Sequence, residues 1–122
     1  MSSQPDPFTQ FLKRQAGDTL RLVVEFTDEG YTAEYVRKDV AQKYSNREFD
    51  SIIDDARKYA SLAHSEAAIE SAGGLYCQVV CFENVVALVF PRDREDTLVT
   101  LDPTAAQNLH SFASDCENFL QE

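Results

Sequence analysis

The sequence predicts an α+β domain in which helices flank a five-stranded antiparallel sheet, in the order α-β-β-α-β-β-β-α. Three observations predict this class. Five short segments are rich in β-branched and aromatic residues, three longer segments carry apolar residues three and four positions apart, and polar turns separate the strand segments. At 122 residues, the chain has the length of one domain. We expect residues 1–7 to be flexible and residues 8–122 to form that domain.

The first third of the chain predicts a helix followed by a β-hairpin. One face of this helix is shared by Phe8, Phe11, Leu12 and Gln15. Gly17 can end the helix, since glycine readily adopts the left-handed conformation found at helix C-termini. Residues 19–26 then alternate between apolar and other side chains, as a strand with one drier face does. Residues 27–30 have the composition of a turn and residues 31–36 alternate again, which predicts a hairpin.

A long second helix is predicted to begin at Ser45. Ser45 and Glu48 have the spacing of a capping box, in which each residue satisfies a free backbone amide of the other. The apolar face of this helix comprises Phe49, Ile52, Ile53, Ala56, Ala60, Ala63 and Ala67. Gly73 and Gly74 are expected to end it.

The last third predicts three strands and a C-terminal helix. Residues 75–82 and 85–90 are two β-rich segments, and the dipeptide Glu83-Asn84 between them fits a two-residue hairpin turn. A fifth strand is expected over residues 97–101, followed by a helix capped by Asp102. The apolar stripe of this helix comprises Ala106, Leu109, Phe112, Ala113, Cys116, Phe119 and Leu120.

The central hairpin is apolar on both faces. With a two-residue turn, one face carries Cys77, Val79, Cys81, Val86, Leu88 and Phe90. The other face carries Tyr76, Val80, Phe82, Val85, Ala87 and Val89. We therefore expect helices or a partner subunit to cover both sides. The ordinary interpretation is a protein core, and the alternative is a partner-binding surface centred on Tyr76 and Phe82.

The chain is strongly acidic, with 21 Asp and Glu against 11 Lys and Arg and a net charge of −10. Acidic residues spread along a compact domain repel one another, and concentrated salt screens that repulsion. We expect a salt-adapted protein of the cytoplasm, because neither a membrane-spanning segment nor a secretory signal is evident. The absence of a basic stripe argues against direct binding of nucleic acid.

The residues that could carry metal or redox chemistry are few. Cys77 and Cys81 lie about 13 Å apart on an extended strand, which is too far for a shared metal ion or a mutual disulfide. We interpret them as buried small hydrophobic residues, and expect Cys116 to be a reduced thiol as well. His64 and His110 are distant in sequence and are interpreted as exposed side chains. We therefore predict no metal and no cofactor.

Two charged clusters have functional interpretations that we regard as secondary. One is a carboxylate cluster, Asp50, Asp54 and Asp55, which we interpret as a solvated helix face. The other is a basic and aromatic cluster that could receive an anionic group, Tyr35, Arg37, Lys38 and Tyr44. We interpret it as a strand end that neutralises Asp39. No phosphate-binding loop or nucleophile motif is present, so we predict that the protein is not an enzyme and has no catalytic residues.

The predicted order of elements resembles the roadblock and dynein-light-chain domains, which are related to longin and profilin-like sheets. In these domains the middle helix covers one face of the sheet, the terminal helices cover the other, and two copies join through edge strands and middle helices. Three segments, residues 18–21, 35–40 and 80–83, also resemble small haloarchaeal proteins of unknown function. The resemblance implies no catalytic residues. It implies a homodimer, and a protein partner such as a small GTPase or a signalling component.

These observations predict a non-enzymatic regulatory or scaffold module that acts through protein contacts. The alternatives are a small-ligand or redox sensor, with its cysteines near a cavity between sheet and helix, and an accessory transcriptional regulator. A cavity with converging polar groups favours a sensor, whereas an exposed apolar edge favours a scaffold. The predicted homodimer interface comprises Ile53, Tyr59, Tyr76, Gln78, Val80 and Phe82.

Overall fold

The structure is a computed structural model, and it describes residues 6–63, 72–73, 75–110, 118–119 and 121. It confirms the predicted class, an α+β domain built on a five-stranded antiparallel sheet of strand order β2-β1-β5-β4-β3. The strands are β1 (Leu20–Phe26), β2 (Tyr31–Val36), β3 (Gln78–Cys81), β4 (Val86–Phe90) and β5 (Asp96–Leu101). The helices are α1 (Pro7–Ala16), η1 (Gly17–Thr19), α2 (Lys38–Lys43), α3 (Asn46–Ala63) and η3 (Pro103–Ala106).

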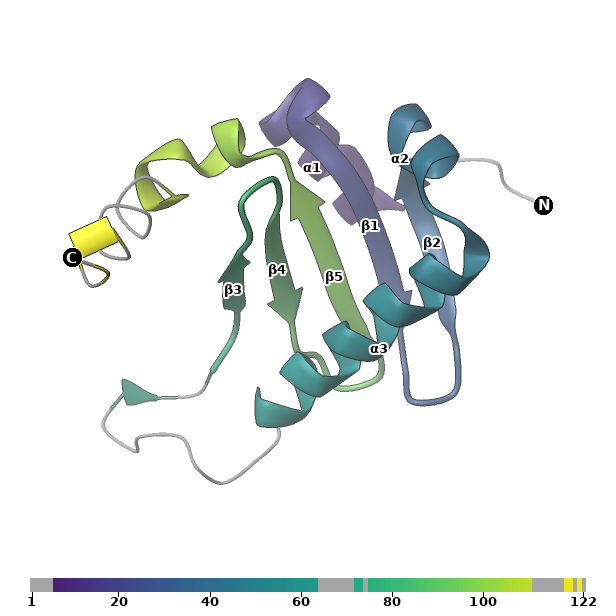
Figure 1. The fold of residues 1–122 in the computed structure, drawn as a ribbon. Helices are drawn as coiled ribbons and strands as arrows, with labels where there is room; N and C mark the ends of the chain where they lie inside the picture. Colours follow the sequence, from purple (N-terminus) through teal and green to yellow (C-terminus); the bar gives the residue numbers. More distant parts are fainter. Residues whose placement is uncertain (1–5, 64–71, 74, 111–117, 120, 122) are drawn as a thin grey trace.

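The sheet has a helix on each face, but the expected coverage of the central hairpin holds only for β4, since Val79 and Cys81 of β3 are exposed. Figure 1 shows α3 crossing one face and α1 lying behind the other. The core on the α3 side comprises Leu22, Val24, Phe26, Ile53, Ala56, Ala60, Ala87, Val89 and Leu98. The core on the α1 side comprises Leu20, Val23 and Val99, with Phe8, Leu12, Leu88 and Phe90 packed against it. Both cores use alternate residues of the same strands, as the sheet period requires.

The start of α3 forms as its sequence predicts, whereas α1 begins at Pro7 with an Asp6 cap, within the segment that was expected to be flexible. At α1, the Asp6 carboxylate accepts a hydrogen bond from the backbone amide of Thr9 at 3.1 Å, and Pro7 occupies the first turn. At α3, Ser45 Oγ accepts from the amide of Glu48, and Glu48 Oε1 accepts from the amide of Ser45, both at 3.2 Å. The predicted capping box is thus confirmed. Gly17 has φ 57°, which explains why glycine ends α1.

Three local features differ from the prediction. Residues 38–43 form the short helix α2 where a polar junction was expected. The third strand covers only residues 78–81, and residues 75–77 are not part of it. After β5, η3 precedes a helical stretch at residues 107–110. Asp102 precedes η3 with Pro103 in its first turn, as predicted, but its side chain makes no capping hydrogen bond and binds Arg21 and Arg37 instead.

Strand β1 contains a bulge that changes the face of the sheet on which its side chains lie. Leu20 pairs with Leu101 and Leu22 pairs with Thr100, so Arg21 is an extra residue on β1. Leu20 therefore packs in the α1-side core and Leu22 in the α3-side core. The simple alternation predicted for this strand holds only from Leu22 onward.

Candidate functional site

Two surfaces of the described structure are candidate binding sites. The first is a groove of about 460 Å³ between α3 and the sheet, which we call the α3 groove. The second is the outer edge of β3, which pairs only with β4 within the described sheet. The two surfaces meet at the β3–β4 turn, because Phe82 and Glu83 line the groove.

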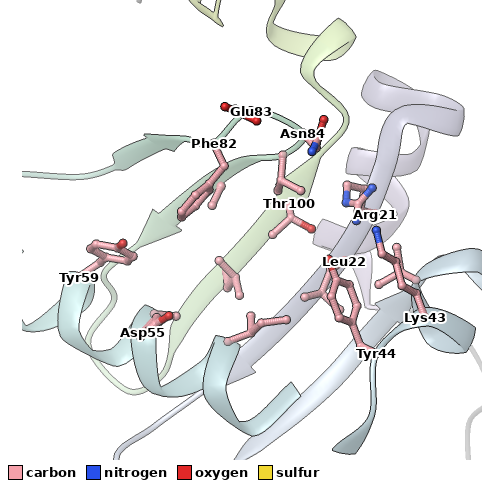
Figure 2. A pocket seen from close by; sticks show the side chains of 16 residues that line it. Arg21, Leu22, Lys43, Tyr44, Asp55, Tyr59, Phe82, Glu83, Asn84 and Thr100 are labelled. Atoms are coloured by element: carbon pink, nitrogen blue, oxygen red, sulfur yellow. The ribbon is translucent and has the colours of Figure 1, made fainter. Parts of the chain in front are cut away.

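The α3 groove has an apolar floor and a mixed rim. Its floor is formed by sheet residues Leu22, Ala87, Leu98 and Thr100. Figure 2 shows Asp55 and Tyr59 on the α3 wall, Phe82 and Asn84 at the turn, and Arg21, Lys43 and Tyr44 together at the opposite end. Lys43 is the last residue of helix α2, which the sequence did not predict, and Tyr44 follows it. The sequence of α2 is mostly polar, and its one buried residue is Val40.

The cationic end of the groove belongs to an ion-pair network centred on Asp102. Arg37 donates to both Asp102 oxygens, from Nη1 to Oδ2 at 2.6 Å and from Nη2 to Oδ1 at 3.1 Å. Arg21 Nη1 donates to the same Oδ1 at 3.2 Å. Arg37 also donates to both oxygens of Asp39. Hydrogen bonds from Arg37, and then from Arg21, hold the pKa of the Asp102 carboxyl below its ordinary value, although partial burial opposes this.

The basic and aromatic cluster is used within the fold. Arg37 binds Asp39, as the preferred interpretation of this cluster held. The ammonium group of Lys13 lies over the Tyr35 ring, 4.7 Å from its centroid. Tyr44 packs edge-on against Phe49 and lines the groove. Arg37 also pairs with Asp102. Asp102 was not predicted to belong to this cluster, because the two residues are far apart in sequence.

The β3 edge is exposed and apolar. Tyr76 is 81% exposed and Val79 is 42% exposed, and Leu75 and Phe82 are also exposed. No residue from 75 to 82 is charged. The amide of Phe82 donates to the carbonyl of Val85 at 2.8 Å. Because hydrogen-bonded pairs alternate along an antiparallel ladder, the amides and carbonyls of Val79 and Cys81 then point away from β4.

The predicted interface residues fall into three groups. Tyr76 and Phe82 are exposed, and Tyr59 is half-buried in the wall of the groove. Gln78 and Val80 are also half-buried, and Val80 packs against the α3-side core. The oxygen Oε1 of Gln78 is buried without a hydrogen-bond partner among the described residues. Ile53 was placed at the interface, but it is 0% exposed and belongs to the core. It is therefore not a surface residue.

The cysteines and histidines give no catalytic arrangement in the described part of the chain. Cys77 is half-buried, and burial raises the pKa of its thiol. Cys81 is exposed, so the interpretation of both cysteines as buried residues was wrong for Cys81. Neither cysteine lines the groove. His110 Nε2 lies 2.8 Å from the carbonyl oxygen of Phe82, and His64 and Cys116 lie outside the described residues.

The carboxylates on α3 behave as a solvated face with local partners. Asp50 accepts a hydrogen bond from the Tyr31 hydroxyl at 3.1 Å, and Arg57 donates to Asp54 at 2.8 Å. Lys58 lies 3.9 Å from Asp55. Within the described ranges, no three His, Cys, Asp or Glu side chains gather as they would around a metal ion. In the same part of the chain, no helix has the length and hydropathy of a membrane span.

The fold and its two surfaces define a small α+β domain with a ligand-sized groove and an open apolar sheet edge. The chain belongs to the family described as a domain of unknown function, DUF7522, whose model matches residues 6–121. Comparison with curated proteins gave no match, and comparison with solved structures gave none either.

Proposed function

We propose that this domain is a non-enzymatic regulatory or scaffold module that acts through protein contacts, and that its β3 edge joins a second copy. The observation that supports this proposal is the composition of the edge. An exposed edge strand normally carries charge or proline that prevents pairing with another strand. The segment from residue 75 to 82 has neither, although the chain as a whole carries 21 acidic residues.

The geometry of the edge suits pairing across a two-fold axis. The outward amides and carbonyls of Val79 and Cys81 offer donors and acceptors to an antiparallel strand. A second β3 would offer the same groups in reverse order, which is the self-complementarity that a two-fold interface requires. The uncharged edge also brings no additional like charges together, unlike most of this acidic surface. The resemblance to roadblock domains extends the proposal to a further protein partner, such as a small GTPase or a signalling component.

The test is the oligomeric state of a pair of lysine variants. Light scattering in molar KCl should give a dimer for the wild type in the micromolar range. Val79→Lys should give a folded monomer, because it places a charge on the edge at a side chain that is already partly exposed. Val80 is unsuitable for this substitution, because its side chain packs against the core.

The matched control is Thr32→Lys, which adds the same charge to the exposed face of β2 at the other edge of the sheet. It should leave the dimer intact. A monomeric wild type, or equal dissociation by both variants, contradicts pairing through β3.

A further inference from the structure

We propose that the α3 groove binds a small monocarboxylate with an apolar body, whose carboxylate lies between Arg21 and Lys43. This inference goes beyond the proposed scaffold function and does not depend on it. The groove volume of about 460 Å³ lies within the roughly 300–1,000 Å³ of small-molecule sites. Such sites combine apolar walls with a few polar groups that orient the ligand, and this groove has both.

The cationic end of the groove is the part that selects an anion. Arg21 is only 9% exposed, and the structure gives its side chain one acceptor, Asp102 Oδ1 at 3.2 Å. That oxygen also accepts from Arg37, so two guanidinium groups share one carboxylate. Lys43 lines the same end, and none of the ion pairs among the described residues includes it.

Counting these side chains gives a local excess of positive charge. Arg21, Arg37 and Lys43 carry three positive charges, and their acidic partners Asp39 and Asp102 carry two negative charges. One added carboxylate balances the cluster. A local excess of positive charge is unusual in a chain with a net charge of −10. Arginine held in place by burial also binds carboxylate with little loss of side-chain freedom.

The rest of the lining sets the other properties of the ligand. Leu22 and Leu98 on the floor, with the rings of Tyr44, Tyr59 and Phe82 around it, favour an aliphatic or aromatic body. Asp55 on α3 and Glu83 at the β3–β4 turn also line the groove. Their charges repel a second anionic group, which disfavours dicarboxylates and phosphate esters of similar length.

The experiment is a titration followed by amide NMR, with hexanoate as the probe and hexanamide as its uncharged control. Hexanoate should shift the amide signals of groove residues such as Leu22, Tyr44 and Leu98. Hexanamide should bind about tenfold more weakly, which corresponds to the loss of one charge-assisted hydrogen bond.

Two lysines on α2 provide matched variants. Lys43→Gln should weaken hexanoate binding by about tenfold, because it removes a cation from the groove. Lys38→Gln removes the same charge from an exposed residue outside the lining and should leave the affinity unchanged. Both variants should keep the wild-type spectrum without ligand.

Four results would overturn the inference: no shifts, equal binding of hexanamide, shifts spread over the surface, or equal effects of the two lysine variants. The inference would also be overturned if hexanoate bound to the Val79→Lys variant but not to the wild type. That result would show that a second copy of the chain occupies the groove of the wild type. Failure of β3 pairing is measured separately by light scattering, so each proposal can fail without the other.

Discussion

Replacing Asp102 with asparagine is expected to destabilise the fold by about 2 kcal/mol at neutral pH. The change keeps the shape of the side chain and removes its charge. Two hydrogen bonds from Arg37 and one from Arg21 lose a charged acceptor. A hydrogen bond to a charged group contributes about 1.5–3 kcal/mol. Arg37 keeps Asp39, and asparagine still accepts one bond, so the loss should equal about one such bond.

The effect should depend on pH in a defined direction. The folded state holds the pKa of Asp102 below its value in the unfolded chain. The pair therefore adds stability above the unfolded pKa, about 3.9, and this stability is lost as the pH falls through the folded pKa. The gap between wild type and Asp102→Asn should be constant from pH 7 to about pH 5 and should close below about pH 4.

Thermal unfolding in molar KCl measures this effect. For a chain of this length, 2 kcal/mol corresponds to a fall in Tm of about 6–10 °C. Asp39→Asn is the control, because the Asp39 side chain also binds Arg37 but is 64% exposed, against 29% for Asp102. Its effect should be much smaller. Equal effects of the two variants, or a gap that does not narrow as the pH falls below about 4, would refute the reasoning.

Four further expectations can be tested directly. Tm should rise as KCl increases from dilute to molar concentration, since salt screens repulsion among 21 acidic residues; a flat or falling Tm contradicts this. Burial, and then the charges of Glu95 and other carboxylates, raise the pKa of Glu25, so Glu25→Gln should stabilise the fold at pH 7 and lose this advantage as the pH falls through the folded pKa; no gain in denaturant titrations at pH 7 would count against it. Ile53→Ala should cost about 2–5 kcal/mol in urea unfolding, because the side chain is fully buried; a loss below 1 kcal/mol would place it outside the core. Iodoacetamide should modify Cys81 faster than Cys77, whose thiol is half-buried with a raised pKa; the reverse order of modification, measured by peptide mass spectrometry, would contradict this.

The sequence predicts the sheet and its helices well because their signals are local. The capping box at Ser45 locates the start of α3 within one residue, whereas the predicted end at Gly73 and Gly74 falls beyond its described part. Strand β2 has the predicted bounds, and the turn at Glu83-Asn84 sets the register of the β3–β4 hairpin. Helix α2 was missed because it is short and contributes one buried side chain, Val40, which is too little to show a period.

The groove and its charges could not be predicted in the same way. Arg21 and Asp102 are 81 residues apart, and no local pattern connects them. Asp102 followed by proline also has the sequence of a helix cap, so its pairing with two arginines was hidden by a stronger local signal. Ile53 was assigned to the interface because periodicity identifies an apolar face but not what covers it. In the structure the chain's own sheet covers it.

The extra residue in β1 is the position where this strand tolerates a change of length. On either side of Arg21, the strand sends alternate residues to opposite faces in opposite phase. Removing Arg21 itself would restore a regular ladder and make Leu20 and Leu22 neighbours on their present, opposite faces, although it would also remove the ion pair with Asp102. Removing a residue from the middle of the strand would instead send the residues on one side of the deletion to the wrong layer. We therefore expect natural variants of this domain that shorten β1 to lose the residue at position 21.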